Sequence, residues 1–480
     1  MKRTVNVLSN LNWGTRACAV LALCATTAIA LPAQTLTTLF SFDGTDGAVP
    51  QAGLVQATNG DLYGTSSFGG ANNLGTVFKI TPSGTLTTLY SFCSQSGCPD
   101  GYDPYAGLVQ ATNGDLYGTT LYGGANGPYG TLFRITTSGT LTTLYSFCSQ
   151  SGCTDGELPL APLVQAANGD LYGTTAYGGV NGLGTVFRVT PSGTLTTLYS
   201  FCSQSGCPDG YDPYAGLVQA TSGDFYGTTV LGGTGGWGTV FKITSSGTLM
   251  TLYSFCPQSG CNSEQPLALV QATNGDFYGT TAFGSVFKIT PSGTETTLYA
   301  FCAKSGCTDG EAPHAGLVQA TNGDFYGTTF KGGANGAGTV FKITLSATLT
   351  TLYSFCSQGG CTDGKSPVAG LLQATNGDFY GTTADGGANN DGTIFSLSVG
   401  LGPFVKTQPT SGNVGAAVKI LGTNLTGATS VSFNGTAAVF TAVSPSLITT
   451  TVPAGASSGK VQVVTPSGTL SSNASFRVVP

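Results

Sequence analysis

The stretch Asn59-Gly-Asp-Leu-Tyr-Gly-Thr65 recurs six more times along the chain, and this repetition decides the fold. The near-copies begin at Asn113, Asn168, Ser222, Asn274, Asn322 and Asn376, at intervals of 54, 55, 54, 52, 48 and 54 residues. A fixed period of this size is typical of repeat architectures, in which each unit is one supersecondary element. The fold therefore has to be derived from one unit and from the way the units join.

One unit is predicted to be a four-stranded meander, with strands termed A, B, C and D. In the second unit strand A covers 108–111 and strand B covers 116–120, with the turn Thr112-Asn113-Gly114-Asp115 between them. Asn-Gly supplies the positive φ angles that a tight hairpin turn needs. A glycine-rich loop leads to strand C at 131–136, and a short turn at 137–139 leads to strand D at 140–147.

The phase of the repeat indicates how the array closes. The chain after its first 33 residues opens with a lone D strand at 36–42, whereas the last unit, 371–397, has strands A, B and C only. Because four-stranded units of this length suit propeller blades, we predict a seven-bladed β-propeller over 34–399, with the N-terminal strand completing the last blade. Closure of this kind removes open sheet edges. A parallel β-helix is the alternative, but it gives no reason to split one unit between the two ends.

The N-terminal segment and the composition indicate an exported protein. Residues 1–33 combine Lys2, Arg3 and Arg16 with an apolar run from Ala17 to Ala30, the pattern of a secretory signal peptide. No second apolar stretch of about 20 residues follows, so we expect no integral membrane segment in the mature chain and a secreted or cell-surface location. Removal of three of the 16 basic residues, against 22 acidic ones, leaves a net charge of −9. Nucleic acid and anionic membranes are therefore excluded as expected partners.

The C-terminal segment is a different kind of domain. Residues 403–480 resemble an IPT/TIG domain, especially in the stretches Gly422-Thr-Asn-Leu425 and Thr451-Val-Pro-Ala454. The resemblance implies an immunoglobulin-like β-sandwich, and in exported bacterial proteins such modules usually act as spacers or interaction domains. Residues 400–402, Gly-Leu-Gly, are a plausible linker.

The repeats themselves resemble the GloVer-type tandem-repeat family of exported bacterial proteins. The shared text over residues 36–399 is Gly-Asp-Leu/Phe-Tyr-Gly-Thr-Thr, then Gly-Gly, then Gly-Thr-Val-Phe-Lys-Ile. This family brings no established activity that could be transferred to the chain.

Twelve of the fourteen cysteines form six pairs of identical spacing directly after strand D. In an exported protein, such equivalent local pairs favour disulfides over metal sites. A single histidine in the whole chain nearly excludes mixed Cys/His zinc sites, and we predict no metal centre. The predicted pairs are Cys93/Cys98, Cys148/Cys153, Cys202/Cys207, Cys256/Cys261, Cys302/Cys307 and Cys356/Cys361.

A ligand site is expected on the face that carries the B-C and D-A loops. These loops are long and vary between units, whereas the A-B and C-D turns on the other face are short and nearly constant. Aromatic rings beside carboxylates suit carbohydrate or protein ligands, although such tyrosines can also simply cover neighbouring blades. The candidate ligand-binding residues are Tyr102, Tyr105, Tyr122, Tyr129, Tyr177, Tyr211, Tyr214, Trp237, Phe283, Asp103 and Asp212. The fifth unit shortens its B-C loop at 281–286, which predicts a notch in this face.

The leading function hypothesis is an extracellular binding or interaction module without catalytic residues. A polysaccharide-acting hydrolase or lyase that uses loop carboxylates and tyrosines is the first alternative, although no spacing selects a carboxylate pair. A structural protein of the envelope matrix is the second. The only histidine, His314, is interpreted as a solvated loop residue. No cofactor is expected, with calcium at the Asp-Gly-Tyr-Asp stretches, 100–103 and 209–212, as the one possibility considered.

Overall fold

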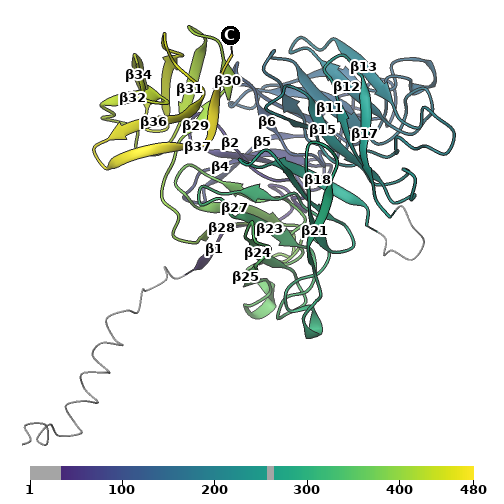
Figure 1. Ribbon diagram of the computed structural model, residues 1–480. Coiled ribbons are helices and arrows are strands. Elements are labelled where there is room, and N and C mark those ends of the chain that lie inside the picture. The colour runs from purple at the N-terminus through teal and green to yellow at the C-terminus, as the bar shows by residue number, and fades with distance from the viewer. Residues whose placement is uncertain (1–33, 257–263, 480) are drawn as a thin grey trace, which may run out of the picture.

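The computed structural model describes residues 34–256 and 264–479, and these residues form an all-β structure (Figure 1). The predicted signal peptide, residues 1–33, lies outside the described residues, as does Cys261. Apart from short 3₁₀ turns η1 (Ser151–Cys153), η2 (Ser305–Cys307) and η3 (Gly359–Cys361), every described element is a strand.

The repeat region contains seven four-stranded antiparallel sheets, numbered here 1 to 7 along the chain. Their strands follow one another in the order A, B, C, D. Sheet 1 consists of β2 (Val55–Gln56), β3 (Leu62–Ser66), β4 (Thr76–Ile80) and β5 (Leu86–Ser91). Sheet 2 consists of β6 (Val109–Gln110), β7 (Leu116–Thr120), β8 (Thr131–Ile135) and β9 (Leu141–Ser146). Sheet 3 consists of β10 (Val164–Gln165), β11 (Leu171–Thr175), β12 (Thr185–Val189) and β13 (Leu195–Ser200). Sheets 4 and 5 are β14 (Val218–Gln219), β15 (Phe225–Thr229), β16 (Thr239–Ile243) and β17 (Leu249–Ser254); and β18 (Pro266–Gln271), β19 (Phe277–Thr281), β20 (Ser285–Ile289) and β21 (Glu295–Ala300). Sheets 6 and 7 are β22 (Val318–Gln319), β23 (Phe325–Thr329), β24 (Thr339–Ile343) and β25 (Leu349–Ser354); and β26 (Leu372–Gln373), β27 (Phe379–Thr383), β28 (Thr393–Ser398) and the N-terminal β1 (Thr35–Ser41).

The N-terminal strand completes the last sheet, as the split repeat predicts. Strand β1 pairs antiparallel with β28, with Thr35 opposite Ser398. The seventh sheet also contacts the first, because the backbone N–H of Thr375 donates to Oε1 of Gln56 at 3.0 Å. The same type of bond joins sheets 1 and 2, from the N–H of Thr58 to Gln110 Oε1 at 2.9 Å. Neighbouring sheets are thus linked in the same way at the closure as within the array.

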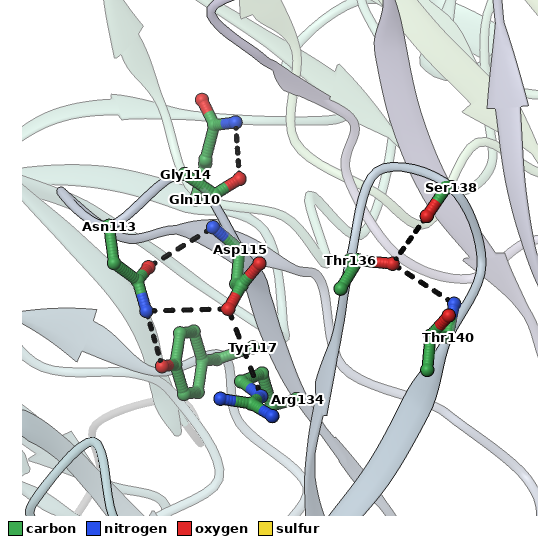
Figure 2. A network of polar contacts seen from close by, with 9 residues as sticks. All are labelled: Gln110, Asn113, Gly114, Asp115, Tyr117, Arg134, Thr136, Ser138 and Thr140. Carbon is green, nitrogen blue, oxygen red and sulfur yellow. Dashed lines mark hydrogen bonds and ion pairs between the residues drawn. The ribbon is translucent and has the colours of Figure 1, made fainter.

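The A-B turns have fewer positive φ angles than the Asn-Gly pair predicts. Figure 2 shows the polar contacts of this turn in sheet 2. Only Gly114 has a positive φ, 96°, because the loop 112–114 has three residues and needs one left-handed position rather than two. The Asn113 side chain accepts from the Asp115 N–H at 3.1 Å and donates to the Tyr117 hydroxyl at 2.9 Å. The asparagine thus anchors the turn to strand B.

Apolar side chains fill the space between successive sheets. Between sheets 1 and 2, for example, Tyr63 and Phe92 pack against Leu116 and Phe133, and all four are fully buried. Ring contacts recur at the other interfaces, such as Tyr172 over Phe225 at 4.2 Å between centroids. Large buried aromatic surfaces of this kind stabilise the array and fix the positions of the loops at its two faces.

Five of the six predicted disulfides lie wholly within the described residues, and all five are formed. Each follows strand D and closes a loop of the D-A connection, where the chain passes to the next sheet. These pairs are Cys93–Cys98, Cys148–Cys153, Cys202–Cys207, Cys302–Cys307 and Cys356–Cys361. They stiffen the face on which the variable loops lie.

The C-terminal residues form a separate two-sheet lobe, drawn in olive to yellow in Figure 1. One sheet has the order β29-β31-β35-β34 and the other β30-β37-β36-β32-β33. Val431, Phe433, Ile448 and Phe476 belong to the buried core between them. The strands are β29 (Lys406–Gln408), β30 (Ser411–Gly412), β31 (Ala417–Leu421), β32 (Ser430–Phe433), β33 (Thr436–Ala438), β34 (Phe440–Ser444), β35 (Leu447–Thr451), β36 (Gly459–Thr465) and β37 (Gly468–Val478).

This lobe is not held by its linker alone, contrary to what a simple spacer would show. Five of its side chains donate to backbone carbonyls at the A-B ends of four different sheets. The bonds are Lys406 Nζ to Gln373 O at 2.6 Å, Gln408 Nε2 to Gln110 O at 2.5 Å, Lys419 Nζ to Thr112 O at 2.8 Å, Ser446 Oγ to Thr58 O at 3.0 Å, and Arg477 to Thr221 O. The lobe therefore covers part of the A-B turn face, and the opposite face, with the B-C and D-A loops, is left for a ligand.

Candidate ligand-binding cavity

Each D-A connection ends in the same unusual backbone turn. The residue before a proline adopts a left-handed conformation in all seven sheets, with φ between 39° and 58°. Hydrogen bonds hold it from both sides: in sheet 4 the Asp212 N–H donates to Leu183 O at 3.2 Å, and Asp212 O accepts from the Val230 N–H at 3.1 Å. The residues at this position are Val49, Asp103, Leu158, Asp212, Gln265, Ala312 and Ser366. The backbone of this turn is thus a constant support, whatever side chain it carries.

The side chain two residues after the left-handed position also varies from sheet to sheet. Around the sheets it is glutamine, tyrosine, leucine, tyrosine, histidine and valine, while the flanking Pro and Ala hardly change. Sheet 5 is one residue shorter here, because two residues lie between Pro266 and Leu269 where three lie between Pro213 and Leu217. The Leu267 carbonyl accepts from Thr228 as that of Ala215 accepts from Thr174, so Leu267 takes the place of the alanine and the preceding position is missing. We term these six residues the mouth ring: Gln51, Tyr105, Leu160, Tyr214, His314 and Val368.

All six residues of the mouth ring line one cavity. Its volume is about 690 Å³, within the range of small-molecule sites in proteins. The D-A connections of all seven sheets contribute to it, so it lies where the innermost strands converge, and we term it the central cavity. Its inner wall is a ring of small and aliphatic residues that includes Gly53, Leu54, Gly107, Leu108, Pro162, Gly216, Ala268, Gly316, Gly370 and Leu371.

The polar groups of the central cavity are few and unevenly placed. The hydroxyl of Tyr214 donates to that of Tyr105 at 3.2 Å, with the rings edge to face at 6.3 Å. His314 stacks on Phe330 at 5.1 Å. Burial and the charge of Lys331 lower the pKa of His314, so that its imidazole is neutral at pH 7. One side of the mouth therefore carries phenol groups and another a neutral imidazole.

The two aspartates predicted as ligand residues occupy equivalent left-handed positions but differ in access. Asp212 lines the central cavity, whereas Asp103 does not and lies beside Ser67. Within the part of the chain that the structure describes, the buried Oδ1 atoms of both carboxylates have no hydrogen-bond donor. Burial raises the pKa of both side chains above the ordinary aspartate value. Because Asp100 and Asp209 also have a buried Oδ1 without a donor, it is the position in the cavity lining, together with the raised pKa, that marks Asp212 as a candidate functional group.

The neighbouring aspartates of the same loops have a structural role instead. Oδ2 of Asp155 accepts from the Tyr145 hydroxyl at 2.7 Å and from the N–H of Ser149 at 2.8 Å. Asp100 repeats this arrangement with Tyr90 at 2.7 Å. In the Asp-Gly-Tyr-Asp stretches considered for calcium, Asp100 is thus committed to a tyrosine rather than paired with Asp103.

The other candidate aromatic residues do not gather at the central cavity. Tyr102 stacks on Tyr122 with centroids 5.5 Å apart, and Trp237 meets Phe283 edge to face at 6.3 Å. Tyr129 and Tyr211 pack against buried clusters between sheets. Tyr177 and Phe283 are exposed on the loop face. Of the eleven predicted ligand residues, the structure brings Tyr105, Tyr214 and Asp212 together.

The shortened loop of sheet 5 reaches the same cavity. Three residues, 282–284, join β19 to β20, whereas nine, 230–238, join β15 to β16 in sheet 4. Ala282 in this short loop and Gln265 before Pro266 both line the central cavity. Sheet 5 thus contributes to the cavity with a short B-C loop and without a mouth-ring residue.

Sequence reasoning missed Gln51, Leu160, His314 and Val368, and it interpreted the histidine as a solvated loop residue. The structure places His314 in the wall of the central cavity. The signal that could have found all four is the alignment of the units on their X-Pro dipeptides, because the residue after the proline changes type while its neighbours do not.

Comparison with known families supports the two-part organisation. Residues 26–208 and 282–438 match the Gloeobacter/Verrucomicrobia repeat model, and residues 404–478 match the IPT/TIG domain model. The chain belongs to the Gloeobacter/Verrucomicrobia repeat family. No curated protein matches the chain in sequence.

Solved structures with similar folds are propeller-like proteins of low sequence identity. Virginiamycin B lyase from Staphylococcus aureus matches with a TM-score of 0.52 and 14% identity, over 76% of this chain and 99% of that one. The extracellular domain of a hybrid two-component system protein from B. thetaiotaomicron matches with a TM-score of 0.52 and 13% identity, over 81% of this chain and 45% of that one. A fungal alcohol oxidase, with 10% identity and a TM-score of 0.51, matches over 93% of this chain and 99% of that one. At such identities the likeness shows the fold alone.

The described residues also bear on the presence of membrane-spanning helices and of metal-ligand groups. No helix among them is long and apolar enough to cross a membrane. Cys148, Cys153 and Glu157 form the one group of three possible metal ligands within 34–256 and 264–479. Because these two cysteines are joined in a disulfide, they do not offer thiolates to a metal.

Proposed function

We propose that the protein is an exported seven-bladed β-propeller that acts as an extracellular binding module. Its ligand, a small molecule or the end of a carbohydrate or protein chain, sits in the central cavity on the face of the B-C and D-A loops. The observation that carries the proposal is the mouth ring, whose side chains differ in nearly identical units while the backbone that presents them stays constant. A rigid support with variable side chains is the usual arrangement of a binding site.

Three further features support this proposal. The disulfide loops brace the same face that carries the cavity. The C-terminal lobe is bonded to the opposite face and leaves the cavity side accessible. Among the proteins of similar fold is the extracellular domain of a hybrid two-component system protein, although this likeness extends to the fold only.

The proposal is tested by filling the cavity. Leu160 lines the central cavity from sheet 3, so Leu160→Trp would occupy the space that a ligand needs. Val180 is 76% exposed on the B-C loop of the same sheet, and Val180→Trp is the matched control. Binding to polysaccharides, peptides and cell-envelope fractions would be measured for the oxidised protein by calorimetry. Binding that Leu160→Trp removes and Val180→Trp retains supports the proposal. Equal binding by all three proteins would place the ligand elsewhere and contradict it.

A second candidate function is a polysaccharide hydrolase or lyase, and one observation favours it. Asp212, with its raised pKa, lies in the same cavity as Tyr214 and the neutral His314, so an acid and a base are both present. The same incubations should therefore be assayed for released sugar. Release that Asp212→Asn abolishes would establish the enzyme, whereas binding without release favours the binding module. A protein that binds nothing through this face would fit the structural matrix alternative.

A further inference from the structure

The charge of the central cavity restricts what it can hold. No lysine or arginine is among its lining residues, and its histidine is neutral at pH 7. A carboxylate or phosphate ligand would therefore be moved out of water without a counter-charge, at a cost of several kcal/mol. Among the described residues that line the cavity Asp212 is the only carboxylate, so the charge that this lining can complement is positive.

Asp212 itself lacks a partner that a ligand could supply. Its Oδ1 is buried and has no donor among the described residues, as is also true of Asp100, Asp103 and Asp209, but of these four carboxylates Asp212 alone lines the cavity. The fold does not require a carboxylate there, since the equivalent positions hold Val49, Leu158 and Ala312. Its left-handed backbone, with φ of 57°, is one that aspartate tolerates better than these residues do, but this preference does not explain an empty acceptor.

The two tyrosines add a second attraction for a cation. Tyr105 and Tyr214 stand edge to face on the same side of the mouth as Asp212. The face of a phenol ring attracts an ammonium group within about 6 Å of its centroid. Deeper in the cavity, Leu54, Leu108 and Leu371 offer only aliphatic surface. The cavity thus combines a cation-attracting mouth with an apolar interior.

We propose that the central cavity binds a small organic ammonium ion, in which a protonated amine is carried on an apolar body. The ammonium group bonds to Asp212 beside the tyrosine pair, and the apolar body packs against the leucines of the inner wall. This inference rests on the proposed binding function and names the chemical class of its ligand.

The test uses matched compounds that share an apolar body and differ only in charge. Phenethylamine, 2-phenylethanol and 3-phenylpropanoate, with their cyclohexyl and indole counterparts, would be titrated into the full-length oxidised protein and followed by NMR and calorimetry. We expect the amines to bind about tenfold more tightly than the alcohols, the factor given by one charge-assisted hydrogen bond, and the acids not to bind. Asp212→Asn should remove this preference. Asp103→Asn is the matched control, because Asp103 lies in a loop of the same sequence but is not itself among the residues that line the cavity.

The outcomes separate this inference from the proposed function. Alcohols that bind as tightly as amines, or an amine preference that survives Asp212→Asn, would overturn the ammonium assignment while the cavity remains a binding site. If none of the compounds binds and Leu160→Trp changes no interaction of the protein, the binding function and the inference both fail. Tighter binding of the amines, lost in Asp212→Asn alone, supports both.

Discussion

The two faces of the repeat array are built from the same strands and differ in what their loops carry. On the A-B face every turn is nearly the same, its side chains bond to one another, and the C-terminal lobe bonds to its carbonyls. On the D-A face the left-handed turn before each proline is just as regular, but the loops around it differ in length and the mouth ring changes residue type from sheet to sheet. Uniform turns can pack against another domain, whereas a ligand site needs the asymmetry that only the second face has.

The same contrast appears within single loops. Asp155 has hydrogen bonds from a tyrosine, a serine and two backbone N–H groups, while Asp212 has a buried oxygen without a donor. We expect the first carboxylate to stabilise the fold and the second to reduce its stability. The predictions below test this division between supporting and functional groups.

The largest effect is expected from removing the closing strand. Deletion of residues 34–42 leaves β28 with an open edge and takes the fully buried Phe42 from the interface between sheets 7 and 1. We expect loss of a single cooperative unfolding transition in calorimetry, together with aggregation. A synthetic peptide of residues 34–42 added to the deleted protein should restore part of the transition. An unchanged transition after deletion would contradict the closed arrangement.

The second largest effect is expected from removing a carboxylate that supports a loop, and the loss of stability should differ between the two faces. Asp155→Ala removes the acceptor of four hydrogen bonds in a fully buried site, and we expect the free energy of unfolding to fall by about 3 kcal/mol. Asp170 on the A-B face is partly exposed and faces Arg188 at 3.8 Å, so Asp170→Ala should cost less than about 1 kcal/mol. Urea unfolding of both variants provides the comparison. Equal losses would mean that the D-A loops are not braced by their aspartates.

The sequence predicts the supporting parts of this molecule better than the functional ones, and particular residues show why. The period and the split repeat predict the pairing of β1 with β28, and the identical spacings predict disulfides such as Cys93–Cys98. Both follow from local pattern. The mouth ring depends instead on which side chains converge across seven sheets, which no spacing within one unit reveals.

The position of the C-terminal lobe could not be predicted for a different reason. Lys406 and Gln408 bond to backbone carbonyls of Gln373 and Gln110. Every residue has a carbonyl, so the acceptor side of this interface has no sequence signature. The resemblance to an IPT/TIG domain gives the fold of the lobe but not the surface on which it docks.

A smaller effect is expected where the C-terminal lobe contacts the A-B face, because the contribution of Lys406 to stability depends on pH. Burial beneath the A-B face lowers the pKa of Lys406 to about 8, and this pKa is below that of an unfolded lysine. Between pH 8 and about 10.4 the unfolded chain binds more protons at this site, so the contribution of Lys406 to stability should rise with pH across that window, on the order of 2 kcal/mol. Thermal unfolding of the natural protein and of Lys406→Met should diverge in this window. Parallel pH profiles would show that the ammonium is not desolvated at the interface.

The smallest expected effect tests whether the carboxylates without a hydrogen-bond donor lower the free energy of unfolding. The pKa of Asp103 and of Asp212 is raised in the folded state, so folding favours their protonated form, and their contribution to stability falls as pH rises from the unfolded pKa of about 3.9 through the folded value. At neutral pH we therefore expect Asp212→Asn and Asp103→Asn each to increase the free energy of unfolding by about 0.5–1 kcal/mol, since an amide avoids the cost of a buried charge. Near pH 3 the gain should disappear. Chemical unfolding at the two pH values measures both, and a loss of stability in Asp212→Asn at neutral pH would show that its carboxylate supports the fold, as Asp155 does, rather than serving a ligand.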